Sequence, residues 1–264
     1  MTKWFVRFLW TLLILVVLGA AMAFYAIDEG WIGYMPPIED LQNPINRYAT
    51  QVYSSDGKLL GTWNYNRENR VLVDYTKLSP ALVQALVATE DVRFYELSGI
   101  DFYALARAII KRGIMGQKSA GGGSTITQQL AKQLYSEHAK TTMERVLQKP
   151  IEWVIAVKLE RNYTKDEIIT MYLNYFDFLH NAVGIKTASD VYFSKEPKDL
   201  TVTEAATLVG LCKNPSYFNP VRNPERSRER RNVVLQQMVK EGYLSEADYE
   251  KYSAQPIQLK FHTA

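Results

Sequence analysis

The pattern of apolar and polar positions divides the chain into one long hydrophobic segment and a mostly amphipathic body. Residues Phe8 to Ile27 form a nearly unbroken apolar stretch, and a helix of that length, at about 1.5 Å per residue, crosses a bilayer core of about 30 Å. Lys3 and Arg7 precede it, which by the positive-inside rule places the following body outside the cytoplasm. A cleaved signal peptide is the alternative, because Ala21-Met22-Ala23 resembles a cleavage site, but the apolar run continues past it.

A short alternating pattern follows this segment. Residues Thr50 to Tyr53 and Leu59 to Trp63 flank Ser55-Asp56-Gly57-Lys58, and an Asp-Gly pair between two such runs predicts a β-hairpin. The turn also fits the Ser-x-x-Lys pattern of penicillin-interacting enzymes. Because that serine should begin a helix in a large domain, we interpret the match as chance.

From Ser79 onward the apolar positions recur with helical spacing. Ser79-Pro80 is typical of a helix start, Thr164 to Glu167 and Thr201 to Glu204 read as capping boxes, and Ser245 begins a last short helix. Few convincing strands follow residue 79. The pattern therefore predicts a mainly α body.

Composition and charge narrow the class of protein. With 264 residues and 47% hydrophobic content, the chain can bury the core of one or two domains, and a net charge of +3 gives no argument for nucleic acid as a partner. Its one cysteine, Cys212, permits no internal disulfide and lies in an apolar run, as a core residue does.

One polar stretch, Gly121 to Lys132, is unsuited to a core. It reads GGGSTITQQLAK: glycines that let backbone approach a ligand, then hydroxyl and amide side chains, then a lysine. A Gly-rich turn leading into a helix offers unpaired N–H groups and a positive dipole end, which suit an anion. A flexible loop capped by Ser124 or Thr125 accounts for the glycines and hydroxyls equally well.

Two carboxylates flank this stretch. Glu90 ends the helix that begins after Ser79, where an acid opposes the helix dipole. Glu152 falls at the predicted start of an apolar helix, Trp153 to Leu159, where an acid is favoured. Sugar transfer needs this inventory: a carboxylate for a hydroxyl proton, and cations for a diphosphate leaving group.

Five ordered blocks resemble the glycosyltransferase domain of class A penicillin-binding proteins, from the hydrophobic segment to about residue 220. Glu90 to Gly99 resembles Glu-Asp-x-x-Phe-x-x-His-x-Gly, Gly121 to Lys132 is the second block, and Gln148 to Glu152 resembles Arg-Lys-x-x-Glu. The remaining blocks are Met171 to Asn174 with Gly184-Ile185 and Val191-Tyr192-Phe193, and Glu204-Ala205-Ala206 through Leu211 and Pro215.

The resemblance implies a mainly α, lysozyme-like glycosyltransferase lobe with a small β-hairpin near the N-terminus, preceded by one transmembrane helix. The implied parts are a cytoplasmic N-terminus (1–7), the transmembrane helix (8–27), a linker (28–48), the hairpin region (49–78), the glycosyltransferase domain (79–220) and a helical connector (221–264). We expect that connector to lead towards a transpeptidase domain, as in bifunctional members. A monofunctional polymerase is the alternative.

The implied activity is polymerisation of lipid II into β-1,4-linked glycan, with inversion and release of undecaprenyl diphosphate. By position, Glu90 is the general base, and Glu152 supports the leaving diphosphate directly or through Lys149 or a divalent ion. Asp91 and Phe94 brace the first block. The implied substrate-binding residues are Ser124, Thr125, Gln128, Gln129, Lys132, Gln148 and Lys149.

The resemblance also implies a setting. No cofactor is required, although Mg²⁺ or Mn²⁺ can assist at the diphosphate, and no metal ligand is assigned. The implied partners are lipid II, the growing glycan strand, the membrane, and proteins of cell-wall elongation or division. The implied location is the bacterial inner membrane, single-pass, with the catalytic domain on the periplasmic side.

Three residues depart from the family pattern. Leu97 stands in place of histidine, Gln148 in place of arginine, and Ser194 in place of a glycine. Arg145, one turn before Gln148, could compensate for the lost guanidinium. The changes at positions 97 and 148 leave one alternative open, a weakened or inactive lipid II-binding scaffold. A lytic glycan hydrolase on a related fold is a third hypothesis, but the diphosphate-suited second block argues against it, since hydrolysis of a glycan needs no diphosphate site.

Two basic segments complete the reading. Ala104 to Met115 mixes apolar and basic residues, which suits either the membrane interface or a surface helix whose apolar face meets the core. Arg222 to Arg231 contains five arginines and predicts a solvated helix.

Overall fold

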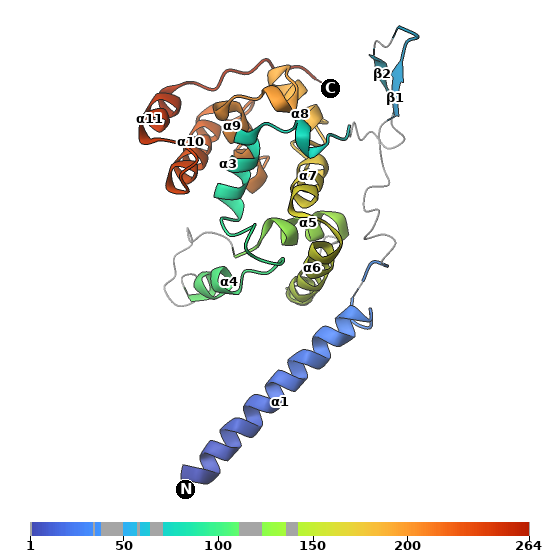
Figure 1. Ribbon diagram of the computed structural model, residues 1–264, viewed down its shortest axis with the longest axis vertical. Helices are drawn as coiled ribbons and strands as arrows, with labels where there is room; N and C mark the ends of the chain where they lie inside the picture. The colour runs from blue at the N-terminus through green and yellow to red at the C-terminus, as the bar shows by residue number, and fades with distance from the viewer. Residues whose placement is uncertain are drawn as a thin grey trace.

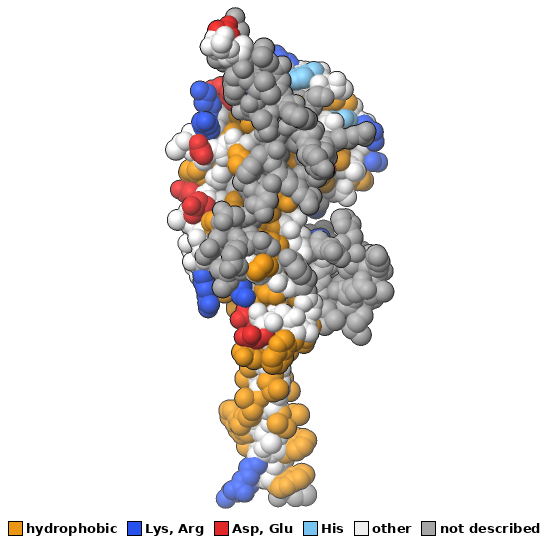
Figure 2. Space-filling view, turned by 90° about the vertical axis from the view of Figure 1, so that its right-hand side faces the viewer, with side chains coloured by type: hydrophobic (Ala, Val, Ile, Leu, Met, Phe, Trp, Pro, Cys, Tyr) orange, Lys and Arg blue, Asp and Glu red, His pale blue; other side chains and the backbone are white. Residues whose placement is uncertain are grey.

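A computed structural model describes residues 2–33, 35–37, 50–56, 59–63, 71–110, 123–135 and 142–263. The apolar segment forms one helix, α1 (Thr2–Asp28), which is long and apolar enough to cross a membrane. It projects from a helical body (Figure 1) as a rod of mostly hydrophobic side chains (Figure 2). The predicted N-terminal helix is confirmed, but it begins six residues earlier than predicted, at Thr2, and ends one residue later, at Asp28.

The predicted hairpin is confirmed. Strands β1 (Thr50–Tyr53) and β2 (Leu59–Trp63) pair antiparallel, with Thr50 opposite Trp63 and an irregularity between Val52 and Tyr53. Ser55 lies in the turn between them, as the argument against a serine nucleophile requires.

The body is mainly α, as predicted. Its helices are α3 (Pro80–Glu90), α4 (Phe102–Ile109), α5 (Ile126–Tyr135), α6 (Thr142–Asn162), α7 (Lys165–Tyr175), α8 (Ile185–Phe193), α9 (Val202–Lys213), α10 (Pro224–Lys240) and α11 (Glu246–Ala254), with 3₁₀ turns η1 (Tyr75–Lys77) and η3 (Pro197–Asp199). The expected caps are present: Ser79 caps α3, Ser245 caps α11, and α7 and α9 begin with complete capping boxes.

The core forms where two groups of helices meet. Helices α3, α9 and α10 pack against one another, while α5 packs against α6 and α7. Leu86 of α3, Leu130 of α5 and Tyr172 of α7 are fully buried in one continuous apolar cluster. Helices α3 and α5, which border the candidate site, are therefore fixed by their own apolar faces.

The predicted helix start at Glu152 is wrong. Helix α6 begins ten residues earlier and continues through Pro150. A proline inside a helix removes one backbone hydrogen bond and costs about 3 kcal/mol. Packing of α6 against α5, with Ile155 and Leu159 fully buried, outweighs that cost, so Lys149 and Glu152 share a rigid helix.

The predicted solvated helix at Arg222 to Arg231 is only partly correct. Helix α10 carries four of these five arginines, all but Arg222, but Arg231 is completely buried, along with Val234 and Leu235. Three acceptors satisfy part of its guanidinium: the carbonyls of Ser253 and Gln255 and the side chain of Asn232. A charge run predicts solvation only where the folded chain offers no such acceptors.

Helix α1 is attached to the body through α6. Phe24 stacks on Trp153 with ring centroids 6.4 Å apart, and the Lys158 ammonium lies 2.7 Å from the Asp28 carboxylate. Just past α1, Gly33 has a φ of +77°, and a Cβ there would lie 2.2 Å from the Ile151 side chain. The helix that carries Glu152 thus contacts the end of the apolar helix.

Candidate active site

Glu90 lies at the C-terminal end of α3, where the sequence places it, and its side chain is 15% exposed. One carboxylate oxygen accepts a hydrogen bond from the Gln129 amide at 2.9 Å. The other lies 3.7 Å from the Arg230 guanidinium. The carboxylate is therefore held from two sides, by α5 and by α10.

Tyr172 fixes the orientation of the Gln129 amide. Its hydroxyl donates to the amide oxygen at 3.1 Å, which leaves the amide N–H₂ to face Glu90. Burial raises the pKa of Tyr172, so this hydroxyl stays protonated and able to donate. Cys212 lies beside Tyr172, and burial raises the pKa of its thiol as well. Its predicted role as a core residue is confirmed.

Arg230 reaches Glu90 from the middle of α10. Its side chain is 10% exposed, and its aliphatic part lies where Gly210 of α9 leaves room, since a Cβ on that glycine would stand 3.2 Å from Arg230 Cγ. Burial lowers the pKa of Arg230, and the Glu90 carboxylate opposes that shift. A guanidinium remains charged at any pH that the fold survives.

Asp91 and Phe94 hold the first block in place. The Asp91 carboxylate accepts the first backbone N–H of α5, from Ile126, at 3.2 Å, and burial raises its pKa to about 6. Phe94 is buried, with the Lys165 ammonium 4.3 Å from its ring centre. Asp91 thereby brings the N-terminus of α5 to the end of α3, beside Glu90.

Thr125 and Gln128 bind the protein's own backbone. The Thr125 hydroxyl and the Gln128 amide both donate to the Gly99 carbonyl, at 2.7 and 3.1 Å, and both residues are buried. The Thr125 oxygen also accepts the Gln128 backbone N–H at 3.1 Å, which is a helix cap. The alternative interpretation of this stretch, a loop capped by Ser124 or Thr125, is therefore correct for Thr125.

Glu152, Lys149 and Ser124 form the second group. Glu152 is buried on α6, and the Lys149 ammonium, one turn before it, lies 2.6 Å from its carboxylate. The same ammonium lies 3.3 Å from the Ser124 hydroxyl, just before α5. Nearly half of the Lys149 side chain is exposed, so this buried carboxylate holds an accessible cation.

The other predicted ligands are placed less closely. Lys132 is exposed on α5, and Gln148 is half-buried on α6. Gly121 and Gly122 lie outside the described residues, as does the side chain of Arg145, so compensation for Gln148 stays a prediction.

Leu97 meets a lysine through its backbone. Its carbonyl accepts a hydrogen bond from Lys165, whose ammonium also lies 2.7 Å from the Glu160 carboxylate. Glu160 in turn accepts a hydrogen bond from Thr127 of α5. The segment in which the family pattern has a histidine is thus fixed by a contact that any residue at position 97 can make.

Sequence reasoning missed the roles of Arg230 and Lys165. Arg230 lies 140 residues from Glu90 and within a run read as solvated. Lys165 lies within the capping box at the start of α7, so sequence reasoning assigned it no role other than that of a residue in the first helical turn. Position alone gave no signal for either contact, because both depend on how distant helices pack.

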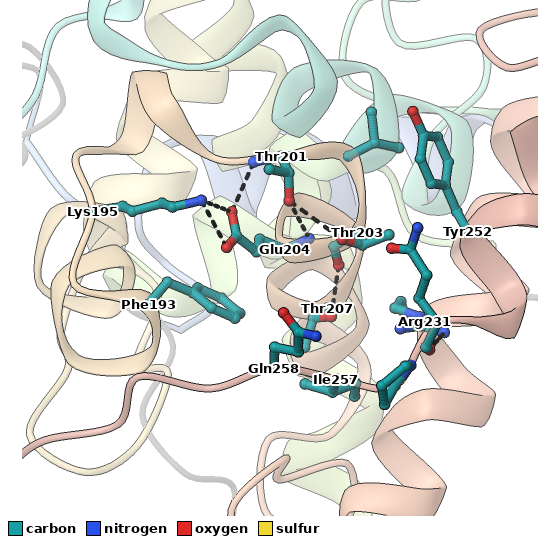
Figure 3. Close-up of a pocket in the computed structure, with 13 residues that line it drawn as sticks. Phe193, Lys195, Thr201, Thr203, Glu204, Thr207, Arg231, Tyr252, Ile257 and Gln258 are labelled. Atoms are coloured by element: carbon teal, nitrogen blue, oxygen red, sulfur yellow. Dashed lines mark hydrogen bonds and ion pairs between the residues drawn. The ribbon is translucent and has the colours of Figure 1, made fainter.

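A cavity of about 390 Å³ lies away from both glutamates, between α8, α9, α10 and the segment after α11. In Figure 3 the Lys195–Glu204 ion pair and the Thr201 cap line one side, and Arg231 and Tyr252 lie on the other. The lining includes neither Glu90 nor Glu152, so this hollow is not the site of the two carboxylates.

Comparison with known proteins assigns the family. A family model described as transglycosylase matches residues 56–239. Penicillin-binding protein 1A of Escherichia coli (strain K12) is 34% identical over 98% of this chain and 30% of its own length, and penicillin-binding protein 1F of Bacillus subtilis (strain 168) is 43% identical over 74% and 26%. The chain thus spans about a third or less of the length of these relatives.

A crystal structure of penicillin-binding protein 1A from Haemophilus influenzae is 24% identical and covers 82% of this chain and 22% of its own, with a TM-score of 0.44. The match to the transglycosylase model contains Glu90, Glu152, all of α5, and α10 up to its last residue but one. The chain therefore belongs to the transglycosylase family.

Proposed function

We propose that this protein is a membrane-anchored peptidoglycan glycosyltransferase that polymerises lipid II into β-1,4-linked glycan. The observation that carries the proposal is the pair of groups around α5. One group is the Glu90 carboxylate, which Gln129 and Arg230 hold. The other is Lys149, which is paired with the Glu152 carboxylate and lies next to Ser124 at the start of α5.

Glu90 is the general base in this proposal. It takes the proton from the 4-hydroxyl of an incoming lipid II while that oxygen forms a bond to C1 of the growing chain's terminal sugar. The bond from C1 to the diphosphate oxygen breaks, and undecaprenyl diphosphate leaves with the electron pair. Attack from the face opposite the leaving group inverts C1 and gives a β-1,4 link.

Lys149 is the principal donor to the leaving diphosphate. Glu152 orients its ammonium, and the Ser124 hydroxyl beside that ammonium is a second donor. Lys132 and Gln148 extend this donor site, with Gln129 between it and the base. Thr125 and Gln128, whose polar atoms bind the Gly99 carbonyl, position the loop.

A divalent cation has limited support from the protein here. Among the described residues no group of three or more His, Cys, Asp or Glu side chains is placed to bind one. Mg²⁺ or Mn²⁺ would be held mainly by the diphosphate's own oxygens, as is common for Mg²⁺ with phosphates.

We place α1 across the inner membrane, with the catalytic body on the periplasmic side. Proteins of cell-wall elongation or division are its expected partners.

The test is polymerisation of lipid II by the full chain in detergent. Wild-type protein should yield glycan that a muramidase digests, and Glu90→Gln should lower kcat by a factor of about 10² to 10⁴, because the amide cannot accept the proton. Glu246→Gln, an exposed change on α11, is the matched control. Absence of polymer from wild-type protein would refute the polymerase.

A non-catalytic lipid II-binding scaffold is the second candidate, favoured by Leu97 and Gln148 in place of the family's histidine and arginine. Leu97→His separates the two. If wild-type protein binds lipid II without polymerising it and Leu97→His restores polymer, the natural chain is the scaffold.

A further inference from the structure

Tyr217 and Arg226 form an exposed stacked pair at the N-terminal end of α10. The Arg226 guanidinium lies 4.6 Å from the centre of the Tyr217 ring, and the ring is 49% exposed. Asn214 fixes the loop below: its side chain accepts the Tyr217 N–H at 3.1 Å and its carbonyl accepts the Phe218 N–H at 3.0 Å. These bonds hold the backbone that carries the ring, and the edge-to-face contact with Phe218 supports the ring itself.

This pair continues directly from the Glu90 site. Arg226 lies one helical turn before Arg230 on α10, so the two project from the same face. The rings of Tyr217 and Phe218 pack edge to face at 4.9 Å, and the Arg230 guanidinium lies 5.9 Å from Phe218. Two arginines on two adjacent rings thus lead outward from Glu90.

The two arginines differ in what they face. Arg230 is nearly buried and lies beside Glu90. Arg226 is exposed, and within the part of the chain that the structure describes no carboxylate lies within 4.0 Å of it. Stacking on a ring holds a guanidinium in one plane while its N–H edge stays open, which suits an anion.

The pair and the donor group lie on different helices. Lys149, Glu152 and Ser124 lie on α6 and before α5, whereas Arg226 and Tyr217 lie on α10, which packs on α3 and α9, and the loop before it. A base between two substrates separates leaving-group donors from the incoming molecule. We propose that Tyr217 and Arg226 form a clamp for an anionic group of the incoming acceptor, an inference that rests on the proposed function.

Two anionic groups of lipid II share the chemistry that Arg226 recognises: the carboxylates of its peptide and its diphosphate. The clamp is a positioning site and touches no reacting atom, so its loss should raise KM and leave kcat within about twofold. For the loss of one charge-assisted, bidentate contact we expect KM for lipid II to rise about 10-fold in Arg226→Gln.

The matched control is Arg228→Gln. It removes the same charge from the same helix, but a residue two positions on faces another direction, and none of the described ring contacts involves it. Tyr217→Ala should raise KM in the same direction by less, because the guanidinium remains but loses its support. Matched thermal midpoints show that the variants fold.

Binding to the full chain, without turnover, identifies the anion. The probes are the lipid-free disaccharide-peptide, the same compound with its carboxylates amidated, and a short prenyl diphosphate. If Arg226→Gln weakens only the first probe, the clamp binds a peptide carboxylate; if it weakens only the third, it binds the diphosphate.

The inference fails if Arg226→Gln matches Arg228→Gln in KM and in the affinity of all three probes. Its failure is distinct from that of the polymerase. Suppose that wild-type protein makes no polymer, and that Arg226→Gln binds one of the probes more weakly than wild-type protein does. The proposed reaction is then wrong, but the anion-binding clamp stands.

Discussion

At the scale of single residues, Asp91 positions the start of α5 but lowers the stability of the fold at neutral pH. It brings the first N–H of α5 to the end of α3, but burial raises its pKa from 3.8 to about 6. A folded-state pKa above the unfolded one means that the folded state binds more protons between these values. The contribution of Asp91 to stability is therefore complete below about pH 4 and is lost as pH rises through about 6.

Asp91→Asn should remove this dependence, because asparagine accepts the same N–H without a charge. Between about pH 4 and pH 7 the wild-type free energy of unfolding should fall by about 3 kcal/mol relative to the variant, an upper value for a shift of this size. Urea titrations in detergent at several pH values measure it. Parallel curves for the two proteins would contradict the assignment.

Ser194 has a strained backbone. It follows α8 with φ of +53°, a left-handed conformation that costs a non-glycine residue about 1 kcal/mol. Ser194→Gly should be about 1 kcal/mol more stable than Ser194→Ala. Both variants lose the hydroxyl bond to the Lys260 carbonyl, so their difference in unfolding free energy isolates the backbone. Equal stabilities would show that position 194 carries no strain.

Single residues were also where the sequence was most informative. Ser79 and the two capping boxes are local signals, since the chemistry that defines them lies within a few positions. Glu90 was singled out by its motif and by its combination with Glu152 and the polar stretch between them. Arg230 and Tyr172 were not assigned to the site, because their contacts with Glu90 and Gln129 join helices that are far apart in the chain. Leu97 is an intermediate case. The sequence shows that leucine replaces the histidine of the family pattern, but it does not show the contact between the Leu97 carbonyl and Lys165.

At the scale of elements, α4 presents an unusual surface. Phe102 and Tyr103 are each 68% exposed, and Arg93 and Arg107 approach the Tyr103 ring at 5.0 and 6.0 Å. Figure 1 places α4 at the end of the body from which α1 projects. Residues 111–115 lie outside the described part, so the amphipathic segment from Ala104 to Met115 stays a prediction. The two residues just before it, at the start of α4, expose aromatic side chains as an interfacial helix does.

A spin label on Tyr103→Cys tests this in the full chain in lipid nanodiscs. Cys212 should not react, because it is buried and burial raises the pKa of its thiol. The label should lie about 5–10 Å into the headgroup and acyl boundary. A label on the exposed Glu246→Cys should remain in water, and equal accessibility of both labels to water would place α4 off the membrane.

Elements also show the limit of propensity. Pro150 marked a helix boundary by local rules, yet α6 continues through it because its face packs on α5. How a whole helix packs depends on contacts between residues that are far apart in the sequence, and a local pattern does not contain them. The boundary error changes the chemistry as well, since Glu152 holds Lys149 within one helix turn and does not serve as an N-terminal acid.

At the scale of the whole molecule, α10 connects the candidate site to the chain's C-terminal segment. Arg230 reaches Glu90, while its neighbour Arg231 donates to the carbonyls of Ser253 and Gln255 at 3.1 and 2.7 Å. That segment then runs beside the cavity of Figure 3 and pairs with the end of α8 through Lys260 N–H and the Tyr192 carbonyl. One helix therefore holds two distant parts in a fixed relation.

Arg231→Lys tests that relation. Lysine keeps the charge but cannot reach several acceptors with a planar fork, so the unfolding free energy should fall by about 2–3 kcal/mol. Amide hydrogens of Lys260 and His262, which bond to α8, should exchange faster than in wild-type protein. Arg222→Lys, at an exposed position before α10, should change neither. If Arg231→Lys lowers stability while those amides exchange at the wild-type rate, Arg231 supports only the core, because a tail released from α10 could not remain protected against α8.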